Sequence, residues 1–198
     1  MSDSIPAALA YQQRLTTLRA EAAELDARSH RYSLFRAVTF LSALACGAYV
    51  LFGEPPVAVA VIGGALGVAF IGLVIAHAML VTKMSALDQR IGLITRAEKR
   101  LLGDFAGFPE QGEGFADASH PYAWDLDLFG KSSLFQLVSS AQTGEGEATL
   151  AAWLCEPASA SEIAARQAAV RELSALTTFR EELAFEGLRA GVKGRKAE

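Results

Sequence analysis

The strongest constraint in this sequence is a pair of long apolar runs separated by only three residues. The runs cover residues 34–53 and 57–81. A helix rises about 1.5 Å per residue, so runs of roughly 20 and 25 residues can each cross a hydrocarbon layer of about 30 Å. The connecting Glu54-Pro55-Pro56 ends one helix and lets the next begin. The pattern predicts a tight antiparallel transmembrane hairpin over residues 34–81.

Composition agrees with a chain that is partly solvated by lipid. Hydrophobic residues make up 52% of the sequence, and the apolar excess is confined to the hairpin. The net charge of −4 gives no reason to expect a polyanionic partner. Cys46 and Cys155 fall in different segments, so we expect neither a disulfide framework nor a zinc site built on paired thiols.

Basic residues predict the orientation of the hairpin. They flank both runs and are absent from the connecting loop, which predicts that both termini lie in the cytoplasm. The location that we expect is the cell inner membrane, with the chain as a multi-pass protein. The basic residues before the hairpin or at its start are Arg14, Arg19, Arg28, Arg31 and Arg36, and those after it are Lys83, Arg90, Arg96, Lys99 and Arg100. A cleaved signal peptide fits less well, because a long region containing acidic residues precedes the first run. A lipoprotein cleavage before Cys46 is disfavoured because apolar sequence continues past it.

Small residues in the second run predict close helix packing. Gly63 and Gly67 form a GxxxG pattern, which allows two helix backbones to approach in lipid. The partner is either the first run, through Ala43 and Gly47, or a second copy of the chain in a homodimer. His77 lies about one turn from the end of the second run, where its ring reaches the membrane interface or serves as a proton relay.

Amphipathic helices are predicted on both sides of the hairpin, over residues 1–33 and 82–102. Their apolar residues recur at alternating steps of three and four, which is typical of one helix face. The members are Tyr11, Leu15, Leu18, Ala22 and Leu25 in the first, and Met84, Leu87, Ile91, Ile94 and Leu101 in the second. These faces either continue the hairpin as a short antiparallel coiled coil or lie on the membrane surface.

The remaining sequence predicts a glycine-rich linker followed by short helices. The linker is residues 103–119, either a spacer or an extended surface segment, and a helical segment covers residues 120–187. Ser132 or Ser133 can cap a first helix, which the glycines of residues 142–146 end. A second helix stops before Pro157. Capping boxes, Ser159 with Glu162 and Thr178 with Glu181, open two more.

The segment over residues 120–187 resembles the MutS family, specifically membrane-anchored MutS-like proteins in which a two-span segment precedes the core and ATPase domains. The residues that carry the resemblance are His120-Pro121-Tyr122, Asp125 to Gly130, Ser133 to Leu137, Gly146, Leu150, Trp153-Leu154, Pro157, Ile163, Arg166, Ala169-Val170, Glu172-Leu173 and Phe179-Arg180. The resemblance implies the start of a helical core domain. It also implies that intact relatives bind ATP with Mg and, by their mismatch-repair role, DNA.

The sequence departs from that family where catalysis is concerned. Nucleotide binding requires a P-loop, G-x-x-x-x-G-K-[ST], and none occurs. Gly130-Lys131-Ser132 repeats only its last letters. Phe108-Pro109-Glu110 matches the family's Phe-x-Glu mismatch-reading letters by chance, because it lies in the linker. We therefore expect a truncated core fragment that is not an enzyme and holds no cofactor.

One cluster of histidine and carboxylates is a candidate for chemistry. His120, Asp125 and Asp127 could ligate a metal or perform acid-base catalysis. The alternative, that they orient and cap the entry to the helical segment, is favoured because no nucleophile or second histidine accompanies them. A basic tail over residues 188–198 is interpreted as solvated, and phosphate or anionic lipid is its alternative ligand.

Together these patterns predict an all-α protein with a transmembrane hairpin, a helical juxtamembrane stalk and a small, incomplete helical core. The function expected is that of a membrane-tethered MutS-like core fragment with a structural or interaction role. The alternative is a self-contained membrane adaptor that dimerises through its transmembrane glycines.

Overall fold

The computed structural model describes residues 4–195 and is all-helical over that range. The helices are α1 (Ser4–Phe52), α2 (Val57–Leu101), α3 (Leu134–Val138), α4 (Gly144–Cys155), α5 (Ala160–Ala175) and α6 (Thr177–Arg195), with a 3-10 turn η1 at Glu113–Phe115. The chain divides into two compact units. Of the described residues, one unit, the hairpin unit, contains 15–91, and the other, the helical unit, contains 4–14 and 92–195.

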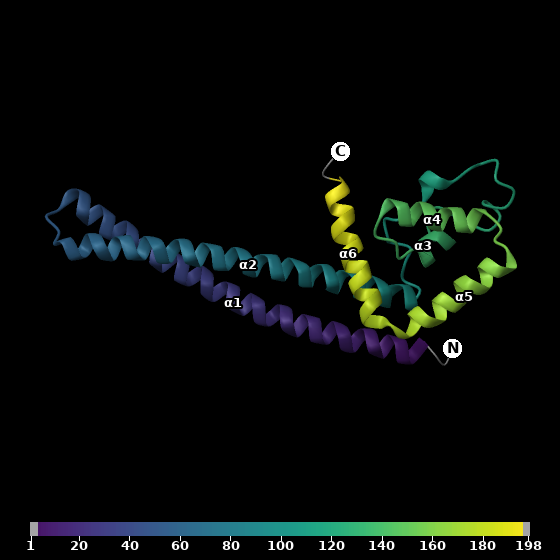
Figure 1. The fold of residues 1–198 in the computed structure, drawn as a ribbon, viewed down its shortest axis with the longest axis horizontal. Coiled ribbons are helices and arrows are strands. Elements are labelled where there is room, and N and C mark those ends of the chain that lie inside the picture. Colours follow the sequence, from purple (N-terminus) through teal and green to yellow (C-terminus); the bar gives the residue numbers. More distant parts are fainter. Residues whose placement is uncertain (1–3, 196–198) are drawn as a thin grey trace. The chain divides into compact units, whose positions relative to one another are not determined.

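The hairpin unit is a pair of long antiparallel helices, α1 and α2, as Figure 1 shows. Helix α1 ends where the amide of Gly53 donates to the carbonyl of Tyr49, and α2 starts after Pro56, whose carbonyl accepts from Val59. Neither helix is interrupted where an apolar run meets its flanking segment, since no proline or paired glycine lies there. The expected hairpin and flanking helices are therefore two continuous rods.

The two helices carry matching heptad patterns. In α1, the residues of the hairpin unit that are not exposed are 15, 18, 22, 25, 29, 32, 36, 39, 42, 43 and 46. In α2, residues that are not exposed recur with the same spacing at 59, 63, 66, 70, 73, 77, 80, 84, 87 and 91. Steps alternating between three and four residues give the 3.5-residue period of a left-handed coiled coil. Phe40 lies 5.4 Å from Phe70 between ring centroids, which fixes the register. The flanking helices therefore continue the hairpin, as the coiled-coil alternative predicted.

The outer surface of the hairpin unit changes abruptly along its length. Large exposed apolar side chains occur throughout residues 34–81, and Leu51, Phe52, Val57 and Val68 are each more than two-thirds exposed. In residues 15–33 and 82–91, all of which the structure describes, no large apolar side chain is exposed. We call residues 34–81 the apolar belt and the two flanking stretches the stalk.

The core of the helical unit forms around the segment that the sequence predicted to be a linker. Phe108 is only 8% exposed, and the amide of Gly130 donates to the carbonyl of Gln111. A Cβ on Gly112 would lie 2.7 Å from the ring of Phe135. Residues 105–112 therefore pack into the unit and are not a spacer, because the phenylalanines among these glycines supply apolar surface to bury. Residues 113–119 are exposed, as the alternative of an extended surface segment expected.

The remaining core side chains come from well-separated parts of the helical unit. Leu128 and Phe135 are almost completely buried, and Ala123, Ala151 and Phe185 are buried as well. Helix α3 contacts α4, and α5 contacts α6 (Figure 1). Gln136 is also buried, and its side-chain amide donates to the carbonyl of Phe108 while its oxygen accepts from the amide of Ser132.

Helix starts in this unit were partly predicted. Ser133 caps α3 and Ser159 caps α5 through a complete capping box with Glu162, as expected. The glycines of residues 142–146 do not end α3, because Ser139 follows its last residue and Thr143 caps a new helix that begins at Gly144. Thr178 is not a cap either, since α6 already begins at Thr177.

Helix α6 continues through most of the segment that was interpreted as a solvated tail. A Cβ on Gly191 would lie 2.6 Å from the carbonyl oxygen of Gln142, and one on Gly187 would lie 3.3 Å from the Cβ of the same residue. These two glycines let α6 approach the loop before α4. Residues 188–191 therefore belong to the packed unit, while residues 196–198 of the basic tail lie outside the described residues.

Candidate functional site

His120 lies at the C-terminal end of α4, where it contacts the last residue of that helix. Its Nε2 is 3.1 Å from the carbonyl oxygen of Cys155, and the hydroxyl of Tyr122 donates to the same oxygen. The amide of Tyr122 faces Nδ1 of His120 at 3.4 Å, so Nε2 is the nitrogen that carries the donated hydrogen. The two side chains together satisfy a carbonyl that the last turn of a helix leaves open.

Asp125 and Asp127 are exposed on the turn that follows. Asp127 has a φ of +46°, and its carbonyl accepts from the amide of Leu134. Ala123 and Leu128 are buried and anchor the turn at both ends. The carboxylates are therefore exposed to solvent, and His120 contacts the C-terminal end of α4 and not, as the capping interpretation had expected, the entry to the helical segment.

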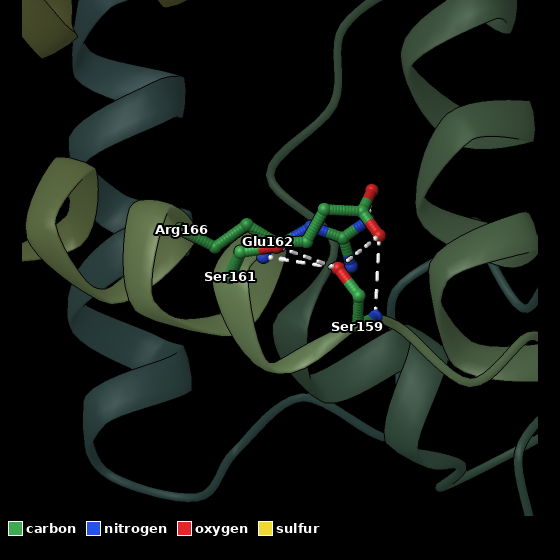
Figure 2. A network of polar contacts seen from close by, with 4 residues as sticks. All are labelled: Ser159, Ser161, Glu162 and Arg166. Carbon is green, nitrogen blue, oxygen red and sulfur yellow. Dashed lines mark hydrogen bonds and ion pairs between the residues drawn. The ribbon is translucent and has the colours of Figure 1, made fainter.

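Trp153 and Arg166 lie together, although the sequence gave no reason to pair them. The guanidinium of Arg166 on α5 is 4.2 Å from the ring centroid of Trp153 on α4, a cation–π contact. Arg166 also lies 3.5 Å from Glu162, which completes the capping box with Ser159 (Figure 2). These two motif residues therefore hold α5 against α4.

Arg96 and Arg100, which the sequence analysis used only to orient the hairpin, form a basic cluster at the end of α2. Arg100 and Arg96 lie over the ring of Phe108 at 4.8 and 5.8 Å, and Arg96 forms a 2.7 Å ion pair with Glu110. Burial lowers the pKa of Arg100, and the charge of Glu110 opposes that shift. The four-residue spacing of the arginines puts them on one helix face and was the available signal. Phe108 and Glu110 thus make contacts inside the unit.

The first turns of α1 are joined to α6 by a two-pronged ion pair. Arg14 donates through Nε and Nη2 to the two carboxylate oxygens of Glu181, both at 2.8 Å. The side chain of Glu181 is only 7% exposed and that of Arg14 is 41% exposed. The sequence had assigned Glu181 to a capping box, and no local pattern relates residues that are 167 positions apart.

Gly63 and Gly67 of the GxxxG pattern are both half-buried on α2. A Cβ on Gly63 would lie 3.1 Å from the Cβ of Cys46, so this glycine faces α1, whereas one on Gly67 would meet nothing within 4 Å. Cys46 makes the closest approach to Gly63. Of the two expected contacts, Ala43 lies on the same seam of α1, whereas Gly47 is exposed. His77 lies on the same seam, and its Nδ1 is enclosed with no hydrogen-bond partner among the described residues.

These arrangements stabilise helices and join segments. Within the described residues, no three histidine, cysteine or acidic side chains lie close enough to hold a metal ion. Comparison with protein-family models, curated proteins and solved structures finds no match for this chain.

Proposed function

We propose that this chain is a membrane tether, whose apolar belt crosses a bilayer and whose stalk connects the belt to a non-catalytic helical unit. The observation that carries the proposal is the sharp boundary of the belt. Large apolar side chains are exposed throughout residues 34–81, and none is exposed in the described stalk on either side. An exposed apolar surface of this extent is unstable in water and is stable in hydrocarbon.

The length and composition of the helices support the same proposal. Both α1 and α2 contain stretches long and apolar enough to cross a membrane, and the most apolar window of each is entirely unburied. A core helix of a soluble protein passes the same length and composition test but is mostly buried. Basic residues flank the belt on both sides and are absent from its connecting loop, which supports cytoplasmic placement of both termini at the inner membrane.

The stalk supports a spacing role. Helix α1 continues for residues 15–33 beyond the belt, which corresponds to roughly 28 Å of helix. The heptad seam runs through this length as well. A paired rod resists bending, so we propose that the stalk itself extends about this far from the lipid.

We also propose that the helical unit derives from the core domain of a MutS-like protein. The order and spacing of the motif over residues 120–187 support it. His120, Trp153 and Arg166 all make contacts that connect or cap helices, a role compatible with the start of a larger helical core. ATP, Mg and DNA binding are implied only for intact relatives, and we propose a structural or interaction role for this chain.

Alkaline carbonate extraction of membranes tests the tether. Wild-type protein should stay in the pellet. Leu44→Arg with Val68→Arg places two charges at exposed positions in the middle of the belt, each at a cost of about 3 kcal/mol for insertion, and should release the protein. The matched control is Ala27→Arg with Ser85→Arg at exposed stalk positions. Wild-type protein found in the soluble fraction would refute the tether, and reporter fusions at both termini test the orientation.

A further inference from the structure

The apolar belt ends at different levels on the two long helices. The packing of Gly63 on Cys46 sets the register of the hairpin, and the three- and four-residue steps of the seam then place residues 28–33 of α1 level with residues 76–81 of α2. The first stretch reads Arg-Ser-His-Arg-Tyr-Ser, and the second reads Ala-His-Ala-Met-Leu-Val. At this level, the pair is therefore cationic on one helix and apolar on the other.

Two cations lie on the same flank of the pair. When two antiparallel helices face each other, the residues that directly precede the seam positions of both helices fall on one flank, and those that directly follow fall on the other. Arg31 precedes Tyr32 of the seam, and Lys83 precedes Met84. Both residues are exposed, and neither forms an ion pair with a residue that the structure describes.

The side chains of these two cations lean toward each other. A helical side chain points back toward the N-terminus of its own helix, so Arg31 leans toward the stalk and Lys83 leans toward the belt. The level of Lys83 is about five residues beyond that of Arg31, or roughly 8 Å along the axis, which two long side chains can close. Arg28 lies on the same flank but is paired with Glu24. Arg31 and Lys83 therefore leave two positive charges without a counter-charge.

The same flank continues into the belt as an apolar surface. Phe35, Val38 and Met79 each directly precede a seam residue, and each is more than half exposed. Gly72 also precedes a seam residue, and a Cβ on it would meet nothing within 4 Å. An occupant that covers this flank therefore needs an apolar part within the belt and an anionic group at its edge.

We propose that this flank binds an anionic phospholipid of the cytoplasmic leaflet. Its phosphate lies between Arg31 and Lys83, and an acyl chain lies along Phe35, Val38 and Gly72. The inference rests on the proposed tether and its orientation, because lysine and arginine at the cytoplasmic edge of a membrane attract the anionic lipids of that leaflet. A free phosphate would use the two cations and leave the apolar side chains uncovered.

The opposite flank at this level lacks the required charge. His30 follows a seam residue there and lies 3.7 Å from Asp26 on the same flank. In the described residues 26–40 and 74–85, no lysine or arginine directly follows a seam residue. One flank of the hairpin is therefore the expected location of the lipid.

Native mass spectrometry of the full chain in detergent tests the contact with the phosphate. The anionic probe is dioleoylphosphatidylglycerol and the zwitterionic probe is dioleoylphosphatidylcholine, and wild-type protein should retain the first in preference to the second. Arg31→Gln with Lys83→Gln should raise the apparent Kd for phosphatidylglycerol about tenfold. Arg19→Gln with Arg171→Gln removes the same charge at exposed positions elsewhere and should leave this Kd unchanged.

A second pair of variants tests the contact with the acyl chain. Gly72→Phe fills the open space on the proposed flank without a change of charge, and it should weaken the binding of phosphatidylglycerol. Gly64→Phe is the matched control, because Gly64 is exposed, has equally open surroundings and follows a seam residue on the opposite flank. Its Kd should equal that of the wild type.

Several results would overturn the proposal. They are equal retention of the two lipids by wild-type protein, an unchanged Kd in the Arg31 and Lys83 double variant or in Gly72→Phe, and displacement of the lipid by an equal concentration of inorganic phosphate. Carbonate extraction reports on the tether separately. The double variant should remain in the pellet, whereas release of wild-type protein would count against the tether itself.

Discussion

The ion pair between Arg14 and Glu181 should make a measurable contribution to the stability of the helical unit. It joins the first turns of α1 to α6 through two hydrogen bonds of 2.8 Å, both between charged groups. An exposed ion pair contributes at most about 1 kcal/mol, whereas removing one member of a fully buried pair costs about 3–5 kcal/mol. Glu181 is buried and Arg14 is 41% exposed, so we expect an intermediate coupling energy of about 1.5 kcal/mol.

The two single substitutions should differ. Arg14→Ala removes two charged hydrogen bonds from a carboxylate whose side chain is only 7% exposed, so we expect it to lower the free energy of unfolding by about 2–3 kcal/mol. Glu181→Ala leaves an arginine that can turn into water, and about 1–2 kcal/mol should be lost. Arg14→Ala should therefore be the more harmful change.

A double-mutant cycle measured by urea unfolding in detergent micelles tests this expectation. The two tryptophans of the chain, Trp124 and Trp153, both lie in the helical unit. Their fluorescence therefore follows this unit with no contribution from the belt. A coupling energy below about 0.3 kcal/mol, the limit of additivity for independent sites, would refute the reasoning, as would Glu181→Ala costing more than Arg14→Ala.

Three further predictions concern the packing around Gly112, the reactivity of Cys155 and the approach of the two long helices at Gly63. Gly112 has a φ of +68° and a Cβ added to it would lie 2.7 Å from the ring of Phe135, whereas Gly103 has a φ of +80° and open space around it. In urea unfolding, Gly112→Ala should lower the free energy of unfolding by about 2–4 kcal/mol and Gly103→Ala by only about 1 kcal/mol. Equal losses would contradict the packing around Phe135. Burial raises the pKa of the Cys155 thiol, so less thiolate forms at a given pH. Iodoacetamide should therefore alkylate Cys155 more slowly than a solvent-exposed thiol at pH 8, and the rate should rise as the pH increases. A rate equal to that of a free thiol would contradict the burial of Cys155. Gly63→Ile should lower the melting temperature of the hairpin in micelles because its side chain meets Cys46, and Gly67→Ile should change it little; the reverse order would show that the register is wrong.

Much of the fold was predictable because it depends on local pattern. Two apolar runs and the Glu54-Pro55-Pro56 link predicted the helical hairpin, and the belt ends at residues 34 and 81, as the hydropathy indicated. The caps at Ser133 and Ser159 were also predicted, since a cap requires only residues within one turn. The three- and four-residue steps before and after the hairpin predicted the stalk seam.

The predictions from sequence were wrong where contacts with distant residues determine the local structure. The segment containing Phe108 and Gly112 has the glycine content of a linker, yet it packs because Phe135, more than twenty positions later, provides a surface for it. Thr178 and Glu181 have the spacing of a capping box, but α6 starts before Thr178 and Glu181 bonds Arg14. Propensity is a weak prior, and tertiary contacts readily override it.

The sequence by itself determined the all-helical class, the position of the belt and the period of the stalk, since hydropathy, proline positions and apolar spacing act within a few turns of the chain. The tertiary structure alone decided which side chains meet across long separations. It placed His120 on the end of α4, Arg166 on Trp153 and Arg14 on Glu181. The physical reason is that such contacts depend on how whole helices pack. A sequence pattern that covers a few residues contains no information about which distant residue will lie beside it.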